Sequence, residues 1–384
     1  MPMNKIEKLI KELCPNGVEW KKLGEICSYT RGITYNKNQE TEDDDSYKVL
    51  RANNIDVYLN KIVFDDIKKV SSLVKVKKEQ FLKSNDILIC AGSGSKDHIG
   101  KIAFIKNDID YTFGGFMAVI RPYKEILNRY IFHILASELF KSYLNKSLNS
   151  TTINNLNSTI IESFSLPLPP LPIQTEIVRI LDKFVEQQEQ LERLIELRKK
   201  QYEYYREEML KPKEGEKWET KTLGEIGKIS IGKKPNEILD KGTFEYINAG
   251  TTCSGYSETY NFEGDTITTP SRGEGGIGFV GYQKKRFWCG PLCYAIKTSE
   301  NNKFIYHYLT LHNKLILDLK CEGGVPALNR KDLITIEIQV PPVAVQEKIV
   351  HTLDSFETTI TTLTTALELS KKRYEYYRDK MMRF

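Results

Sequence analysis

The sequence predicts an α+β protein made of two copies of one unit, each a mixed α+β domain followed by a long helix. The main observation is a repeat: KKQYEYYREEML at 199–210 returns as KKRYEYYRDKMM at 371–382. At the same offset, PPLPIQTEIVRILDKF at 169–184 aligns with PPVAVQEKIVHTLDSF at 341–356. A repeat of this length indicates a duplicated structural unit, here with pseudo-twofold symmetry.

The composition is that of a globular protein. Of 384 residues, 40% are hydrophobic and 28% are charged, and the net charge of +5 permits a nucleic-acid partner without requiring one. No apolar run approaches the ~20 residues that span a bilayer, so we expect no membrane association. Seven cysteines stand singly, which is typical of reduced thiols in the cytoplasm.

Two variable domains are expected, over residues 1–168 and 213–340. Short β-like runs such as DILICA and CYAIK alternate with Gly, Asn and Asp turns and with modest helical stretches, which predicts mixed α+β domains. The first domain begins with a short helix over Asn4–Cys14, which precedes Trp20 as YYREEML precedes Trp218. We therefore expect this helix to take, beside the first domain, the place that the end of the first long helix takes beside the second.

Long helices are expected over 169–212 and 341–384, because apolar residues recur there in steps of four and three. Such heptad spacing predicts a coiled-coil seam. The seam positions are Ile177, Leu181, Phe184, Gln188, Leu191, Ile195, Arg198, Tyr202, Tyr205 and Met209 in the first helix, and Ile349, Leu353, Phe356, Ile360, Leu363, Leu367, Ser370, Tyr374, Tyr377 and Met381 in the second. Pro172 and Pro212 suit the start and the end of the first helix.

No pattern in the chain indicates a catalytic residue, a metal site or a cofactor. The glycine-rich loops at 91–101 and 270–278 contain neither GxxxxGK[ST] nor GxSxG, and the histidines show no HExxH spacing. His133 and His307 fall in apolar helical stretches, where a packed histidine is favoured over a ligand. Asp45 together with Asp66–Lys68 can be matched to the Asp…Asp-x-Lys pattern of nucleases, but such spacings are common by chance. The sequence therefore predicts a protein that binds rather than reacts.

The arrangement closely resembles the specificity subunit of type I restriction–modification systems. The resemblance rests on the paired helix starts PPLPIQ and PPVAVQ, on the domain starts WKKLGEI at 20–26 and WETKTLGEI at 218–226, and on the opening ELCPNGVEWKKLGEI at 12–26. It implies that each variable part is a target recognition domain that reads one half of an asymmetric bipartite duplex DNA site. It also implies that the two helical regions pack as an antiparallel coiled coil and set the spacing of the half-sites.

The resemblance further implies partners and a division of labour. The subunit itself has no active site, and two modification subunits dock on it to methylate adenine with S-adenosylmethionine. Restriction and motor subunits join the complex to cleave DNA with ATP.

Candidate DNA-binding residues are polar or basic side chains in the expected loops, since Arg, Lys, Asn, Gln and Ser read base edges and hold phosphates. In the first domain they are Arg31, Arg51, Asn53, Asn54, Ser93, Ser95, Lys96 and Lys101. In the second they are Lys233, Lys234, Asn248, Thr251, Ser271, Arg272, Lys284 and Lys285. Each could equally be a solvated surface residue; their recurrence in corresponding loops favours the set.

Four apolar residues lie off the seam: Leu197 and Tyr204 in the first helix, and Leu369 and Tyr376 in the second. They pack either on the adjoining recognition domain or against helices of the modification subunits. On the second reading, each YEYYR segment supplies two tyrosines to the seam and one to a partner.

Two other function classes stay open. One is a coiled-coil scaffold whose globular parts bind proteins; the other is a nuclease or methyltransferase with an unrecognised site. Salt-dependent binding of a defined duplex would separate the first from a DNA-recognition subunit, because phosphate contacts release counterions.

Overall fold

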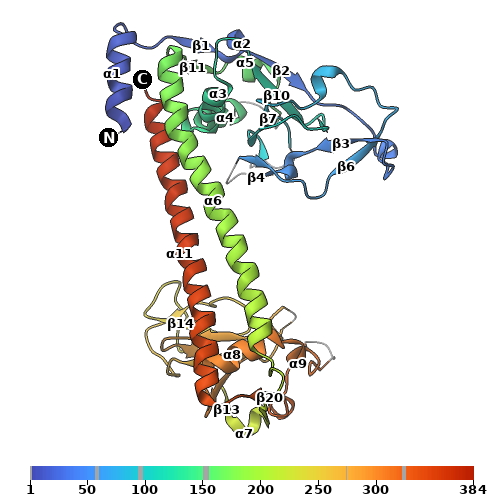
Figure 1. Ribbon diagram of the computed structural model, residues 1–384, viewed down its shortest axis with the longest axis vertical. Coiled ribbons are helices and arrows are strands. Elements are labelled where there is room, and N and C mark those ends of the chain that lie inside the picture. Colours follow the sequence, from blue (N-terminus) through green and yellow to red (C-terminus); the bar gives the residue numbers. More distant parts are fainter. Residues whose placement is uncertain (1, 57–59, 94–97, 150–154, 274, 322–325) are drawn as a thin grey trace. The chain divides into compact units, whose positions relative to one another are not determined.

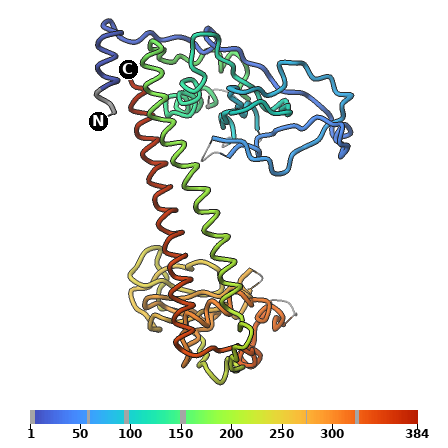
Figure 2. The backbone as a smooth tube through the Cα atoms, viewed as in Figure 1, coloured from blue at the N-terminus to red at the C-terminus, as the bar shows by residue number. Residues whose placement is uncertain are grey.

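The computed structural model describes residues 2–56, 60–93, 98–149, 155–273, 275–321 and 326–384. They form two compact units, unit 1 from Met1–Glu192 with Thr365–Phe384, and unit 2 from Arg193–Thr364. Both ends of the chain lie in unit 1 (Figure 2). The predicted α+β architecture of two mixed domains and two long helices is confirmed (Figure 1).

Unit 1 contains one recognition domain together with segments of both long helices. Its strands are β1 (Trp20–Lys22), β2 (Cys27–Arg31), β3 (Ser46–Leu50), β4 (Ile55–Asp56), β5 (Lys61–Ile62), β6 (Lys68–Ser71), β7 (Ile87–Cys90), β8 (Ile102–Phe104), β9 (Thr112–Phe113), β10 (Met117–Pro122) and β11 (Ser165–Pro167). Its helices are α1 (Pro2–Leu13), α2 (Leu23–Ile26), α3 (Asn128–Ala136), α4 (Glu138–Asn149), α5 (Ser158–Glu162) and the first part of α6 (Leu171–Met209).

Unit 2 repeats this plan with fewer elements. Its strands are β12 (Glu219–Thr222), β13 (Gly227–Ile231), β14 (Phe244–Ile247), β15 (Tyr256–Ser257), β16 (Thr266–Pro270), β17 (Gly281–Gln283), β18 (Trp288–Cys289), β19 (Cys293–Thr298) and β20 (Glu337–Val340). Its helices are α7 (Leu223–Ile226), α8 (Asn302–Leu311), α9 (Lys314–Leu317), α10 (Arg330–Leu333), the second part of α6 and the first part of α11 (Val343–Met381).

The internal repeat extends to the sheets, whose sequences differ. Unit 1 has an antiparallel sheet in the order β2-β10-β7-β8, and unit 2 has one in the order β13-β19-β16-β17. Each unit also has a three-stranded sheet with one parallel pair, β3 with β9 and β14 with β18. Gly32 and Gly232 follow the equivalent edge strands, and a Cβ atom at either would overlap carbonyl oxygens of the neighbouring strand end. Only glycine allows this close approach of two backbones.

The repeated Pro-Pro-x-x-x-Gln pattern has a structural reason. Gln174 is buried, its Nε2 donates to the Pro169 carbonyl at 2.8 Å, and its Oε1 accepts from the Leu127 amide at 3.1 Å. Gln346 makes the same bonds in unit 2, to the Pro341 carbonyl at 2.9 Å and from the Asn301 amide at 3.0 Å. One side chain therefore joins the start of each long helix to the start of a recognition-domain helix.

The long helices pair antiparallel within each unit. In unit 1, Phe184 of α6 stacks on Tyr377 of α11 with ring centroids 5.6 Å apart. In unit 2 the roles reverse, and Tyr205 of α6 stacks on Phe356 of α11 at 5.4 Å. The seam predicted from the heptads is thus present in both units, with a matched aromatic pair in each.

The other two seam tyrosines bind recognition-domain histidines, which the heptads alone did not indicate. The Tyr374 hydroxyl lies 2.9 Å from Nδ1 of His133 on α3, and Nε2 of His133 lies 2.9 Å from Asp182 of α6. Tyr202 approaches His307 on α8 more loosely, at 3.5 Å. Each YEYYR segment therefore uses one tyrosine to stack across the seam and one to tie the helix to a recognition domain.

The expectation for the N-terminal helix is wrong. In unit 2, the end of α6 places Leu210 in the core, and in unit 1 the same place is taken by Met381 and Met382 at the end of α11. Helix α1 is an addition that packs Ile6 into the same core and pairs Lys5 with Glu176 at 2.9 Å.

Candidate nucleic-acid interface

One end of the four-stranded sheet in unit 1 gathers several predicted residues into a first rim, defined by Arg31, Gly92, Ser93, Phe116 and Asn155. Strands β2 and β7 end here, and β10 starts here. Arg31 Nη2 donates to Asn155 Oδ1, and residues Gly92 and Asn155 form a β-bridge. Arg31 Nη1 is covered and has no hydrogen-bond partner in the part of the chain that the structure describes. Antiparallel pairing thus brings together residues from four separate segments.

Phe116 and Asn155 were missed by the sequence reasoning. Phe116 is 72% exposed, and Asn155 is exposed as well. The candidates predicted in this domain are polar or basic residues that precede β8. Phe116 was missed because it is apolar, and Asn155 was missed because it lies far along the chain. The sequence GGF at 114–116 was the available indication, because an aromatic residue after two glycines is placed in a turn.

Arg51, Asn53 and Asn54 follow strand β3 beside the first rim, since the Gly114 amide bonds the Leu50 carbonyl at 3.0 Å. Arg51 and Asn53 both hold Asp66, at 2.8 and 3.1 Å, and Asn53 is exposed. Asn54 is fully buried, and its side chain bonds three backbone groups, one at Arg51 and two in the segment that follows β5. We therefore assign Asn54 a structural role and leave it out of the contacts proposed below.

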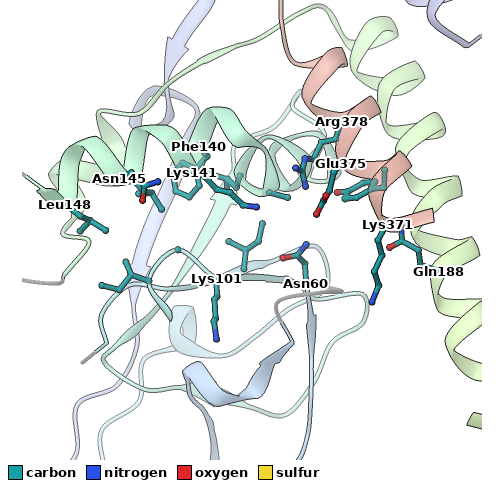
Figure 3. Close-up of a pocket in the computed structure, with 17 residues that line it drawn as sticks. Asn60, Lys101, Phe140, Lys141, Asn145, Leu148, Gln188, Lys371, Glu375 and Arg378 are labelled. Carbon is teal, nitrogen blue, oxygen red and sulfur yellow. The ribbon is translucent and has the colours of Figure 1, made fainter. Parts of the chain in front are cut away.

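Lys101 lies at the mouth of a cavity of about 650 Å³ in unit 1, between α4 and the 98–102 loop (Figure 3). Its carbonyl accepts from the Cys90 amide at 2.8 Å, so it adjoins the first rim. Lys141, Lys371 and Arg378 also line the cavity, against one carboxylate, Glu375. Arg378 is paired with Asp379 at 3.0 Å, and Lys371 lies 3.8 Å from Glu192, so these two cations serve ion pairs of the unit itself. Ser95 and Lys96 lie outside the described residues.

Unit 2 has a second rim at the equivalent sheet end, defined by Ile231, Lys233, Ser271, Arg272 and Leu292. The match is close: the Leu156 amide bonds the Ala91 carbonyl in unit 1, and the Leu328 amide bonds the Ser271 carbonyl in unit 2. By this register Arg272 corresponds to Gly92, and Ile231 to Arg31. Gly273 then corresponds to Ser93. Each rim has one arginine, but Arg31 ends the edge strand β2 whereas Arg272 lies in the loop after β16.

The remaining residues predicted in unit 2 divide into two groups. Asn248 joins the second rim, where its Oδ1 accepts from the Leu292 amide at 3.0 Å, and Lys233, Lys234 and Thr251 are exposed. Ser271 is 5% exposed, so it presents little beyond its backbone.

Lys284 and Lys285 are exposed but follow β17, beyond Gln283, which pairs with Thr266 at the start of β16. Arg272 follows the other end of β16. The structure therefore does not bring these two lysines to the second rim.

The off-seam residues are exposed in both units: Leu197 by 52%, Tyr204 by 60%, Leu369 by 48% and Tyr376 by 61%. Tyr204 and Tyr376 each contact the neighbouring seam tyrosine edge-on, at 5.4 and 5.3 Å. We term these four residues the helix patches. Exposed apolar side chains in matched positions are typical of interaction sites.

Two ionisable groups with shifted pKa values, His133 and Asp182, join α3 to α6. Burial lowers the pKa of His133 to about 4, and the histidine and Arg129 hold the pKa of Asp182 at about 2 against desolvation. In the described residues, no group of three or more His, Cys, Asp or Glu side chains is arranged to hold a metal ion. A search of the described helices also finds none long and apolar enough to cross a membrane.

Comparison with known proteins identifies the fold and its relatives. Residues 15–199 and 215–370 match the model of the type I restriction modification DNA specificity domain. The chain is 26% identical over 416 residues to S.HindORF215P of Haemophilus influenzae, described as a type I restriction enzyme specificity subunit, covering 99% of this chain and 98% of the relative. It is 35% identical over 247 residues to the EcoR124I/EcoR124II specificity subunit of Escherichia coli, covering 57% and 61%.

A solved structure shows the same fold. The type I restriction–modification S subunit of M. genitalium has a TM-score of 0.64 at 19% identity, covering 96% of this chain and 97% of that one.

Proposed function

Because this chain belongs to the type I restriction–modification DNA specificity family and is a specificity subunit with two target recognition domains, we propose that each domain reads one half of a bipartite duplex DNA site. The observation that carries this proposal is the pair of rims. Two sheets of the same strand order present different donors at the same end: an arginine from the edge strand in unit 1, and one from the loop after β16 in unit 2. Different donors read different base edges.

The proposed contacts divide by chemistry. Arg31, Asn53 and Ser93 in the first rim region, and Arg272, Asn248 and Thr251 in the second, suit base edges. Lys101, Lys233 and Lys234 suit phosphates, and Ser95 and Lys96 remain predicted contacts. Arg51 reaches DNA only by exchanging its bond to Asp66 for a phosphate or base. Lys284 and Lys285 suit phosphates flanking the half-site, because they lie at the far end of the sheet.

We also propose that the helices perform two tasks. Residues 169–212 and 341–384 separate the recognition domains at 1–168 and 213–340 and so set the spacing of the half-sites. The helix patches dock two modification subunits, one for each unit, and the restriction and motor subunits join through that complex. The chain itself is proposed to have no active site, so adenine methylation and ATP-dependent cleavage belong to the partners.

The test starts from the methylated adenines of a strain that carries the system, which define both half-sites. Purified complex should bind a duplex with this site at least about 10³-fold more tightly than a duplex with both half-sites scrambled, at physiological salt. Affinity should fall steeply with salt, as phosphate contacts require. Equal binding of both duplexes would contradict the proposal and favour the scaffold alternative.

A further inference from the structure

One strongly exposed residue of the first rim is apolar, and its backbone is fixed by hydrogen bonds. Phe116 exposes 72% of its surface, although its backbone is held firmly. Its carbonyl accepts two hydrogen bonds, from the Ala91 amide at 2.8 Å and the Gly92 amide at 2.9 Å, and the Met117 amide closes the turn onto Gly114 at 2.7 Å. A flexible loop could turn such a side chain inward, but these hydrogen bonds fix the backbone at Phe116 with its side chain exposed.

The neighbours of the ring are polar groups of the same rim. A Cβ atom at position 92 would lie 3.0 Å from Phe116 Cδ1 and 3.5 Å from Asn155 Oδ1, so glycine leaves the space that the ring occupies. Asn155 in turn accepts from Arg31 Nη2. Phe116, Asn155 and Arg31 therefore form one continuous surface of an apolar ring, an amide and a guanidinium.

The second rim also contains an arginine and an exposed apolar residue, but at other positions. Its arginine is Arg272, at the position of Gly92, and its exposed apolar residue is Ile231, 56% exposed, at the position of Arg31. Leu292, at the position of Phe116, is only partly exposed. An arginine and an exposed apolar side chain thus occur on the same rim in both units, where the sequence repeat does not require it, which points to a shared ligand.

Resting on the proposed function, we infer that Phe116 is a specificity-determining residue that contacts the C5-methyl group of one thymine in the first half-site. In the major groove that methyl group is the one apolar feature of a base pair, and it is recognised by apolar side chains beside Arg and Asn contacts. Arg31 and Asn155 read the neighbouring bases, and the ring distinguishes thymine from cytosine at its own position.

The experiment replaces each thymine of the first half-site, on either strand, by deoxyuridine, which removes only the methyl group. With the wild-type complex, one such duplex should bind about fourfold more weakly, as burial of one methyl group implies. Phe116→Ala should bind the normal site about tenfold more weakly and should no longer distinguish thymine from deoxyuridine at that position. Phe116→Leu should retain part of both effects.

Two controls keep the outcomes separate. Leu73→Ala truncates a residue of the same domain that is 92% exposed, beyond the far end of β3, and should change neither measurement. Deoxyuridine in the second half-site should act equally on wild type and Phe116→Ala. If the wild type binds its site specifically but no first-half thymine is sensitive, or if Phe116→Ala keeps the sensitivity, the inference about Phe116 is wrong. If the wild type shows no site-specific binding, the proposed function fails instead.

Discussion

Charges in the helix patches should release the modification subunits one at a time. Tyr204 lies in unit 2 and Tyr376 in unit 1, with 60% and 61% of their surfaces exposed. For a tyrosine of about 200 Å², each has ~120 Å² left to bury on docking. At ~25 cal/mol per Å² that area corresponds to about 3 kcal/mol, or roughly 150-fold in affinity. Replacement by Asp removes this contribution and also puts a charge into an apolar contact.

The expected result is a change of stoichiometry, measured by native mass spectrometry of co-purified complexes. Wild type should carry two modification subunits, Tyr204→Asp or Tyr376→Asp one, and the double variant none. Within the chain Tyr204→Asp loses an edge-on contact to Tyr205, and Tyr376→Asp loses the matching contact to Tyr377 together with a cation–π contact to Lys380. These exposed contacts contribute little to folding, so circular dichroism should show folded protein.

Matched controls decide the interpretation. Tyr204→Phe keeps the ring and should keep both partners, and Lys199→Asp puts the same charge on another face of α6 and should do the same. The reasoning is refuted if the double variant keeps both subunits, if Lys199→Asp releases one as well, or if the Asp variants unfold.

Three further predictions concern stability, target and spacing. Burial lowers the pKa of His133 and His307 from 6.5 to about 4. Both histidines therefore stay neutral in the folded chain, whereas those of the unfolded chain become protonated below pH 6.5. The free energy of unfolding should accordingly fall as the pH is lowered from 6.5 to 4. The loss from pH 7.5 to 4.5 is on the order of 2–3 kcal/mol for each histidine. The free energy of unfolding of His133→Gln should therefore depend less on pH than that of wild type, by the contribution of one histidine. Since Arg31 ends β2 and Arg272 lies in the loop after β16, the two rims present their arginines from different positions, and the methylated motif should have unlike half-sites. A palindromic motif in methylation mapping would contradict this. Seven residues inserted into each long helix, after residues 192 and 364, keep the heptad repeat and lengthen each helix by about 10.5 Å. In a library of targets with graded gaps between the half-sites, the preferred gap should grow by about three base pairs at 3.4 Å each. An unchanged gap would show that the helices do not set the spacing.

The repeat and the helices could be read from the sequence because their determinants are local. Heptad steps place residues on one face of a helix whatever surrounds it. The expected helical regions at 169–212 and 341–384 accordingly contain α6 (Leu171–Met209) and α11 (Val343–Met381). Helical spacing also placed the helix patches off the seam, but it left open whether a recognition domain covers them.

The rims could not be read in this way, because strand register decides them. Arg31 and Asn155 meet across 124 positions, and no local pattern connects them. Lys284 and Lys285 looked equivalent to the other loop candidates, but β17 runs antiparallel to β16 and carries them to the opposite end of the sheet. The binding of Tyr374 to His133 likewise depends on packing between a helix and a recognition domain. Spacing along the chain therefore determined the elements, and pairing between distant segments determined which side chains share a surface.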